Sequence, residues 1–261
     1  MSTDHQSAPN NQLLASLPPE VFDRLQSRLE AVDLAVGTQL YEAGTVLRHV
    51  YFPATAVVSL VSALQDGASA EVAVVGREGI VGVFAFMGGG KTLSGAVVQR
   101  AGLAWRMGAR DIADLARESV PVMQQLLRYT QALFCHMAQT SVCHRHHALA
   151  PQLCRWLLQH LDRQTGDDMQ ITQERIAGML GVRREGVTGA AQQLQREGLI
   201  RYTRGQIRVL DRRRLQQHSC ECYSVVERAY EQMRNGSSAW SAPAGSQNQP
   251  FRNESNASLN A

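Results

Sequence analysis

A glycine-rich stretch, Phe86–Gly95 (FMGGGKTLSG), contains the residue types of a nucleotide-binding phosphate loop. Such a loop has the spacing G-x-x-x-x-G-K-[ST] and opens a helix whose amide groups hold the phosphates. Counted back from Gly90, the first glycine of that motif falls on Ala85. The residues that follow, LSGAVVQRAG, are typical of a strand. We therefore expect these glycines to form a turn between two strands, and we expect the chain not to be an enzyme.

Cysteines and histidines recur on one expected helix between residues 135 and 147. Cys143 and His147, four residues apart, fall on the same helix face and could share a metal ion, as could His144 with His136 two turns away. A helix face of packed cysteines and solvated histidines is the alternative. The sequence identifies no cofactor, and Cys143, His144 and His147 are the residues to consider as metal ligands.

Arginine is concentrated between Ile171 and Leu215, where ten arginines and four acidic residues give a net charge of +6. The ten are Arg175, Arg183, Arg184, Arg196, Arg201, Arg204, Arg208, Arg212, Arg213 and Arg214. Because the whole chain carries +3, the remainder is at −3. A basic module attached to a mildly acidic one predicts a nucleic-acid partner for the C-terminal part. A solvated arginine face is the alternative on charge alone.

The pattern of the same segment predicts the elements that present these arginines. Thr172 can cap a short helix that ends near Leu180, and Gly181 supplies a tight turn. A second helix is expected from about Arg183 to Glu197. The residues LIRYTRGQIRVLD are typical of two short strands joined by TRGQ. Helix, turn, helix and hairpin together predict a winged helix-turn-helix.

The second helix of such a module fits the major groove of double-stranded DNA, where arginine pairs with guanine and glutamate accepts from cytosine. Phosphate contacts would come from the N-terminus of the first helix and from the hairpin. The candidate DNA-binding residues are Thr172, Gln173, Arg183, Arg184, Glu185, Thr188, Gly189, Arg204 and Arg208. A winged helix that contacts only protein is the competing interpretation.

The rest of the chain shows helical and β patterns in turn. Apolar residues recur at helical spacing from Leu13 to Leu29, and Val32–Met107 consists of short β-branched runs separated by glycines. No glycine interrupts the helical run Ser119–His147, and the helical pattern resumes from Leu149 to Asp162. A heptad row on the long run is typical of a helix that packs in a dimer or along its own domain. That row is Met123, Leu126, Thr130, Leu133, Met137, Thr140, His144 and His147.

The order of β module, long helix and winged helix resembles the cyclic-AMP receptor protein (Crp/Fnr) family of bacterial transcription regulators, over roughly Leu13–Cys222. The segment Arg184–Val187 (REGV) matches the R-E-x-[VI] common in that family's recognition helix, and Ser219–Tyr223 (SCECY) resembles a signature of one branch. The resemblance implies an α+β fold with an N-terminal double-stranded β-helix (jelly-roll) sensor domain, a long dimerisation helix and a C-terminal winged helix-turn-helix. It also implies a homodimer on a palindromic operator, contact with RNA polymerase and a small-molecule effector of unknown identity.

These patterns suggest a division of the chain. We expect a flexible N-terminus at 1–11, the sensor domain at 12–118, the dimerisation helix at 119–147, the DNA-binding domain at 148–222, a helical extension at 223–235 and a disordered tail at 236–261. Hydrophobic and charged contents of 44% and 19% fit a soluble globular protein. With no apolar stretch near the roughly 18 residues that cross a bilayer, no secretory signal and five unevenly spread cysteines, we expect a cytoplasmic protein without a membrane partner.

Two departures from the family pattern concern the effector and the operator. Cyclic-nucleotide binders use a G-E-[LIV] segment and then an arginine before Ser/Thr-Ala, which neutralises the cyclic phosphate. Here the stretches read REGIVGV and TLSGAVV without that arginine, so we expect an effector other than cyclic AMP. The candidate effector-pocket residues are Gly76, Gly79, Gly82, Ser94, Gly95, Ala96 and Met137. Gly189 stands where the recognition helix often has a second arginine, so the operator is expected to differ.

Two alternative functions stay open at this point. A metal-, haem- or redox-responsive regulator of the same fold would use the Cys/His-rich helix, and the Cys-x-Cys of SCECY could be a redox pair. A nucleotide-hydrolysing enzyme would use the GGGKT loop, against the spacing described above.

Overall fold

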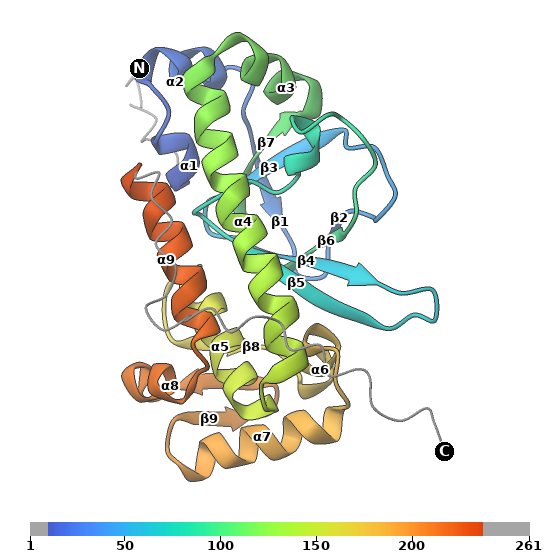
Figure 1. Ribbon diagram of the computed structural model, residues 1–261, viewed down its shortest axis with the longest axis vertical. Coiled ribbons are helices and arrows are strands. Elements are labelled where there is room, and N and C mark those ends of the chain that lie inside the picture. Colours follow the sequence, from blue (N-terminus) through green and yellow to red (C-terminus); the bar gives the residue numbers. More distant parts are fainter. Residues whose placement is uncertain (1–9, 237–261) are drawn as a thin grey trace, which may run out of the picture.

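The computed structural model describes residues 10–236 of the 261-residue chain (Figure 1). The strands are β1 (Glu30–Leu34), β2 (Gln39–Tyr41), β3 (His49–Pro53), β4 (Val57–Ala63), β5 (Ser69–Val75), β6 (Gly95–Arg100), β7 (Gly102–Gly108), β8 (Asp168–Gln170), β9 (Ile200–Thr203) and β10 (Gln206–Val209). The helices are α1 (Gln12–Ala15), α2 (Pro19–Gln26), α3 (Ala109–Glu118), α4 (Val120–His146), α5 (Leu149–Leu161), α6 (Gln173–Leu180), α7 (Arg184–Arg196), α8 (Arg212–His218) and α9 (Cys222–Asn235), with a 3-10 turn η1 (Val83–Ala85).

The N-terminal part is a β-roll of two antiparallel sheets, with strand orders β1-β7-β3 and β2-β6-β4-β5. Alternate side chains of these strands face inward, and Phe52, Val58 and Val98 are at most 1% exposed. The buried face continues under α4 through Leu126 and Tyr129. This arrangement confirms the predicted jelly-roll, long helix and winged helix.

The glycine-rich stretch forms a turn, as predicted. Gly88 and Gly89 have φ angles of 124° and 68°, a left-handed backbone that favours glycine, and the chain then enters β6 at Gly95. Because a strand follows, the stretch lacks the helix N-terminus that a phosphate loop uses to hold phosphate.

The N-terminal segment differs from its prediction. The pattern from Leu13 to Leu29 gives two short helices, α1 and α2; Pro18 precedes α2 and Pro19 is its first residue. Asn11, assigned to a flexible N-terminus, is buried: its amide donates to Pro53 O at 2.9 Å and Gly79 O at 2.8 Å, while its Oδ1 caps α1. The remaining expectations of flexibility, at 1–9 and 237–261, lie outside the described residues.

Helix α4 runs the length of the molecule and is covered on two sides by its own chain. One side packs on the β-roll, and α9 runs alongside another (Figure 1). Of the two partners expected for the heptad row, its own domain is the one observed, because Leu126, Thr130 and Leu133 are at most 3% exposed within this one chain. The most apolar row of α4 packs in the internal core, so the residues that α4 exposes to solvent lie on a different face of the helix.

The C-terminal part has a second core of its own. Trp156 and Leu157 of α5 pack with Ile176 of α6, Leu194 of α7 and Ile207 of β10. The predicted hairpin gains a third strand, so the sheet order is β8-β10-β9, and α7 lies at the end of the molecule far from α2 and α3 (Figure 1). Sequence patterns did not predict β8, α3 or α8. β8 and α8 are short, whereas α3 carries a clear apolar row, Ala109, Ile112, Leu115 and Ala116, that could have been found in the sequence. No helix within residues 10–236 combines the length and hydropathy of a membrane-spanning segment.

Gly79→Ala should destabilise the fold. An added Cβ would lie 2.0 Å from the Tyr129 ring, which is fully buried, so the ring or the loop must shift. Overpacking of this kind costs about 1–3 kcal/mol, which urea unfolding would measure. Gly178→Ala is the matched control: it meets nothing within 4 Å and lies inside α6, so stability should stay level or rise by up to about 1 kcal/mol. Equal stability of the two variants would contradict the close packing of Gly79 against the Tyr129 ring.

Candidate nucleic-acid interface

Helices α6 and α7 have the caps and turn that the sequence predicts. The Thr172 hydroxyl accepts from the Arg175 amide at 3.2 Å, which fixes the start of α6. Gly181 ends α6 with φ 66°, and α7 begins three residues beyond it at Arg184, with Arg183 as its N-cap. This short turn holds α7 against the second core.

The outward face of α7 carries the predicted base-reading residues. Arg184, Glu185 and Gly189 are exposed, whereas Val187 is fully buried on the opposite face. The Thr188 hydroxyl is half-buried and donates to Gln173 Oε1 at 2.7 Å, which joins α7 to the N-terminus of α6. Thr188 and Gln173 therefore help to fix the angle between the helices.

The wing lies beside the N-terminus of α6. Ile171 N donates to Gly205 O at 2.7 Å, so the β9–β10 turn is held next to Thr172. Arg204 and Gly205 form that two-residue turn with φ angles of 47° and 79°. Arg204 is the one described non-glycine residue with positive φ, and the wing tip thus presents an exposed arginine at a position where glycine or asparagine is usual.

Arg208 is engaged within the wing. Its guanidinium donates to both carboxylate oxygens of Asp168, at 2.5 Å and 2.7 Å. These hydrogen bonds raise the pKa of Arg208 and lower the pKa of Asp168. The cross-strand neighbour Arg201 is exposed, and sequence reasoning did not select it. The hairpin register would have identified it as the neighbour of Arg208.

Six of the ten arginines have no hydrogen-bond or ion-pair partner for their guanidinium within residues 10–236. They are Arg183, Arg184, Arg196, Arg201, Arg204 and Arg213. Arg212 instead pairs with Asp162, and Arg214 donates to Glu197 O at 3.1 Å. An arginine face without acidic partners has the electrostatic character of a surface that binds phosphates.

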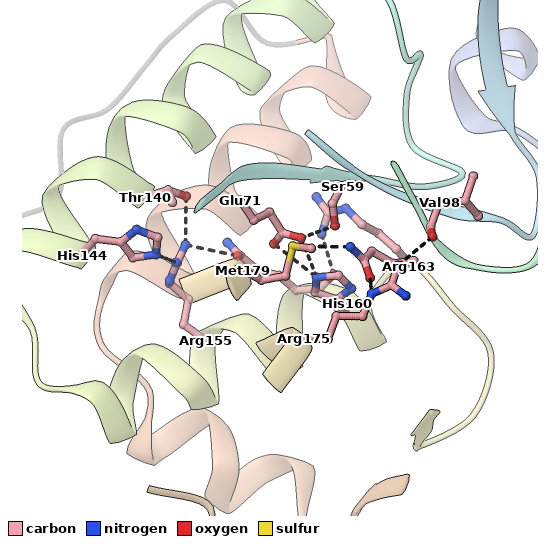
Figure 2. Close-up of polar contacts among 12 residues, drawn as sticks. Ser59, Glu71, Val98, Thr140, His144, Arg155, His160, Arg163, Arg175 and Met179 are labelled. Carbon is pink, nitrogen blue, oxygen red and sulfur yellow. Dashed lines mark hydrogen bonds and ion pairs between the residues drawn. The ribbon is translucent and has the colours of Figure 1, made fainter. Parts of the chain in front are cut away.

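Arg175 faces the sensor domain instead. From α6 its guanidinium donates to Gln99 Oε1 at 2.8 Å and to Val98 O at 3.2 Å, both on β6 (Figure 2). Gln99 in turn donates to Met179 Sδ at 3.4 Å. The first helix of the helix-turn-helix is therefore docked on the β-roll.

A buried ion pair and a buried histidine–carboxylate contact also join the β-roll to the C-terminal part. Glu78, in the loop after β5, accepts from Arg163 Nε at 2.7 Å, and both side chains are at most 7% exposed. Glu71 of β5 lies 3.2 Å from His160 Nε2 of α5 and also accepts from Ser59 (Figure 2). Burial tends to lower the pKa of Arg163, but Glu78 raises it above the usual value, so the guanidinium stays charged.

Arg155 of α5 completes this polar network at the end of α4. It donates to Thr140 Oγ1 at 3.0 Å and Gln159 Oε1 at 3.2 Å, and it lies 3.4 Å from His144 Nε2 (Figure 2). Burial, with Arg155 nearby, lowers the pKa of His144. His144 thus belongs to this network and lies apart from the other two metal-ligand candidates, Cys143 and His147.

Two known domain families match the chain in the order that the structure shows. Residues 31–119 match the cyclic nucleotide-binding domain, and residues 151–218 match the Crp-like helix-turn-helix domain. The chain belongs to the Crp/Fnr family of transcriptional regulators. It has the family's DNA-binding helix-turn-helix and a cyclic nucleotide-binding-like domain.

Solved Crp/Fnr structures share this fold at low sequence identity. FixK2 from Bradyrhizobium japonicum has a TM-score of 0.62 at 19% identity, covering 74% of this chain and 98% of its own. A putative Crp/Fnr regulator from Eubacterium rectale has a TM-score of 0.64 at 18% identity, covering 80% of this chain and 98% of its own. TTHB099, a CRP family regulator from Thermus thermophilus, has a TM-score of 0.56 at 21% identity, covering 72% of this chain and 96% of its own. A search of curated proteins gave no match.

The predicted effector residues of this Crp/Fnr chain lie mostly in packed surroundings. A Cβ at Gly76 would meet Arg163, and one at Gly79 would meet Tyr129, so these glycines allow α4 and the Arg163 segment to approach the β-roll. Gly82 has φ 109° beside Val50. The other four occupy varied positions: Ser94 and Ala96 are buried, Gly95 is half-buried at the start of β6, and Met137 packs on the first core. That these residues line an effector pocket stays a prediction.

Arg163→Met should destabilise this Crp/Fnr chain by about 3–5 kcal/mol, because it leaves the Glu78 carboxylate buried without its cation. Glu78→Gln should also be costly, and the double variant should lose less than the two single losses together. Urea unfolding of the four proteins measures this coupling.

The exposed pair Arg24–Glu118 is the control for that cycle, with side chains 63% and 60% exposed. Arg24→Met and Glu118→Gln should each change stability by less than about 1 kcal/mol. Additive losses at Arg163 and Glu78 would show that the two side chains do not act as a pair.

Proposed function

We propose that this chain is a homodimeric regulator that reads a palindromic DNA operator through α7. The observation that supports it is the exposed face of α7, which presents Arg184 and Glu185 without protein partners at one end of the molecule (Figure 1). The wing tip adds a further exposed arginine, Arg204, whose guanidinium has no partner among residues 10–236. A helix with polar side chains on its outer face fits the major groove.

Each side chain has a distinct task in this proposal. Arg184 would pair with a guanine and Glu185 would accept from a cytosine amino group. Thr172, at the N-terminus of α6, and Arg204, at the wing tip, would contact phosphates on either side. Gly189 offers no side chain to a base, so one position of the operator would be read weakly or not at all.

The partner that completes the operator would be a second copy of this chain, bound along α4. Val120, Leu127, Phe134 and Val142 are 51–68% exposed and recur at spacings of seven or eight residues on one helix face. This row is what a parallel two-stranded helix pair buries. A twofold axis along α4 would place two α7 helices on the two half-sites of a palindrome.

The effector of this regulator would be a molecule other than cyclic AMP. In the segment that matches the cyclic phosphate site, Thr92 donates to Glu42 O at 2.7 Å and Ser94 is buried, and neither supplies a cation. A cyclic phosphate there would lose its hydration without an ionic partner. By the same family resemblance, bound dimers would act through RNA polymerase.

Arg184→Ala should lower affinity for the operator and leave weak binding to random DNA. One bidentate contact in each of the two half-sites makes the loss about 2–6 kcal/mol per dimer, so specific affinity should fall by at least about 30-fold. Arg204→Asn should lower affinity for both DNAs and reduce the salt slope by about two, because each protomer loses one phosphate contact. Asparagine suits the left-handed turn, so the wing should keep its shape. Fluorescence anisotropy across a salt series measures both.

Arg48, on the sensor domain, provides the control: Arg48→Ala should leave both affinities unchanged. Retention of specific affinity in Arg184→Ala would mean that α7 is not the reading helix.

Phe134→Asp should convert the dimer to a monomer, because a carboxylate would be buried in the apolar row of the helix pair. Sedimentation velocity measures the change, and operator affinity should fall with it. Leu93→Asp is the matched control, since Leu93 is 77% exposed on the β-roll and away from α4. A dimer that persists in Phe134→Asp would place the interface on another surface.

A further inference from the structure

Three cysteines and a histidine meet where α4 ends and α9 begins. Cys143 and His147 come from the end of α4, one helical turn apart, and Cys220 and Cys222 come from the SCECY segment that leads into α9. Their four ligand atoms all lie within 4.8 Å of one another. The Sγ atoms of Cys143 and Cys220 are 3.5 Å apart, and Cys222 Sγ lies 3.4 Å from His147 Nδ1.

These distances are close to the separations between the ligand atoms of one tetrahedrally coordinated ion. A zinc ion with Zn–S bonds of about 2.3 Å holds two sulfur ligands about 3.8 Å apart, and a sulfur–nitrogen pair slightly closer. A disulfide would instead require an S–S distance of about 2.05 Å and would use only two of the four groups.

The cysteines do not act as ordinary core residues. Cys143 and Cys222 are fully buried and Cys220 is 8% exposed, yet the three sulfurs pack on one another in a cluster separate from both large cores. Cys154, by contrast, packs within the second core among leucines. Thiol groups are weak hydrogen-bond donors, so a buried group of three satisfies its polar atoms poorly without an ion.

The surroundings orient these groups as ligands. The Glu221 carboxylate lies 3.3 Å from His147 Nε2, which leaves Nδ1 directed at the cluster. A carboxylate on the outer nitrogen of a ligating histidine is the usual support in metal sites. The Gln139 amide donates to Cys222 Sγ at 3.1 Å, and Cys222 is the first residue of α9, where the helix N-terminus favours a thiolate.

We propose that Cys143, His147, Cys220 and Cys222 bind one thiophilic divalent cation of the zinc class, with all four positions filled by the protein. Three sulfurs and one imidazole are a donor set for zinc, and a site without an open position is structural rather than catalytic. The ion would link the start of α9 to the end of α4, next to the point where α5 begins. This proposal goes beyond the regulator function and does not depend on operator binding.

The test uses the full chain. Purified without chelator, it should contain one zinc per chain by elemental analysis. After the zinc is removed under reducing conditions, one equivalent of Co²⁺ should restore the visible and near-ultraviolet absorption of a tetrahedral cobalt–thiolate site. Cys143→Ser and Cys222→Ser should lose that absorption. Cys135→Ser, on the same helix outside the cluster, should keep it.

Two further variants separate ligation from folding. His147→Cys should still bind one Co²⁺ and show stronger thiolate absorption, because it adds a fourth sulfur. Gln139→Ala should weaken Co²⁺ affinity about 10- to 100-fold through the lost contact to Cys222. Should the serine variants fail to fold, the cobalt spectrum of the unmodified chain decides by itself.

Three results would overturn the proposal. The first is an unmodified chain that binds no Co²⁺ under reducing conditions. The second is cobalt–thiolate absorption that Cys222→Ser leaves unchanged. The third is a Cys143–Cys220 disulfide that survives reductant and excludes the ion.

Discussion

The buried ion pair between Arg163 and Glu78 is the constraint on which the arrangement of the two domains depends. Arg163 follows the first helix of the DNA-binding domain, and Glu78 belongs to the β-roll. A charged guanidinium is kept out of water only where a carboxylate faces it, so the two domains have one relative position that satisfies both groups. The Glu71–His160 contact and the Arg175 hydrogen bonds to β6 act in the same direction.

This junction determines which surfaces remain for function. With α6 docked on β5 and β6 and α5 in contact with β5 through His160, α7 and the wing still turn polar faces outward. The same packing uses one side of α4, and α9 uses another, which leaves the row through Leu127 and Phe134 exposed. The buried contacts therefore leave uncovered both the helix proposed to read DNA and the helix face proposed to pair with a second chain.

The end of α4 is where these constraints converge. Within one helical turn, Thr140 and His144 contact Arg155 of the DNA-binding domain, while Cys143 joins the sulfur cluster at the start of α9. A change in the sensor domain that shifts α4 would therefore reach the DNA-binding domain through polar contacts with strict geometry. Such contacts transmit a displacement better than apolar packing, because a donor and acceptor pair tolerates little misalignment.

The sequence by itself determined the type of most elements, though not β8, α3 or α8, and it also determined the winged helix-turn-helix and the outward face of α7. These follow from local rules, because the Thr172 cap, the Gly181 turn and the periodicity around Val187 act over a few residues. Only the tertiary structure decided which row of α4 is internal, that Arg175 binds the β-roll and that Cys220 and Cys222 meet Cys143. Each of these depends on contacts between residues some 75 or more positions apart, and no local pattern encodes such a distance.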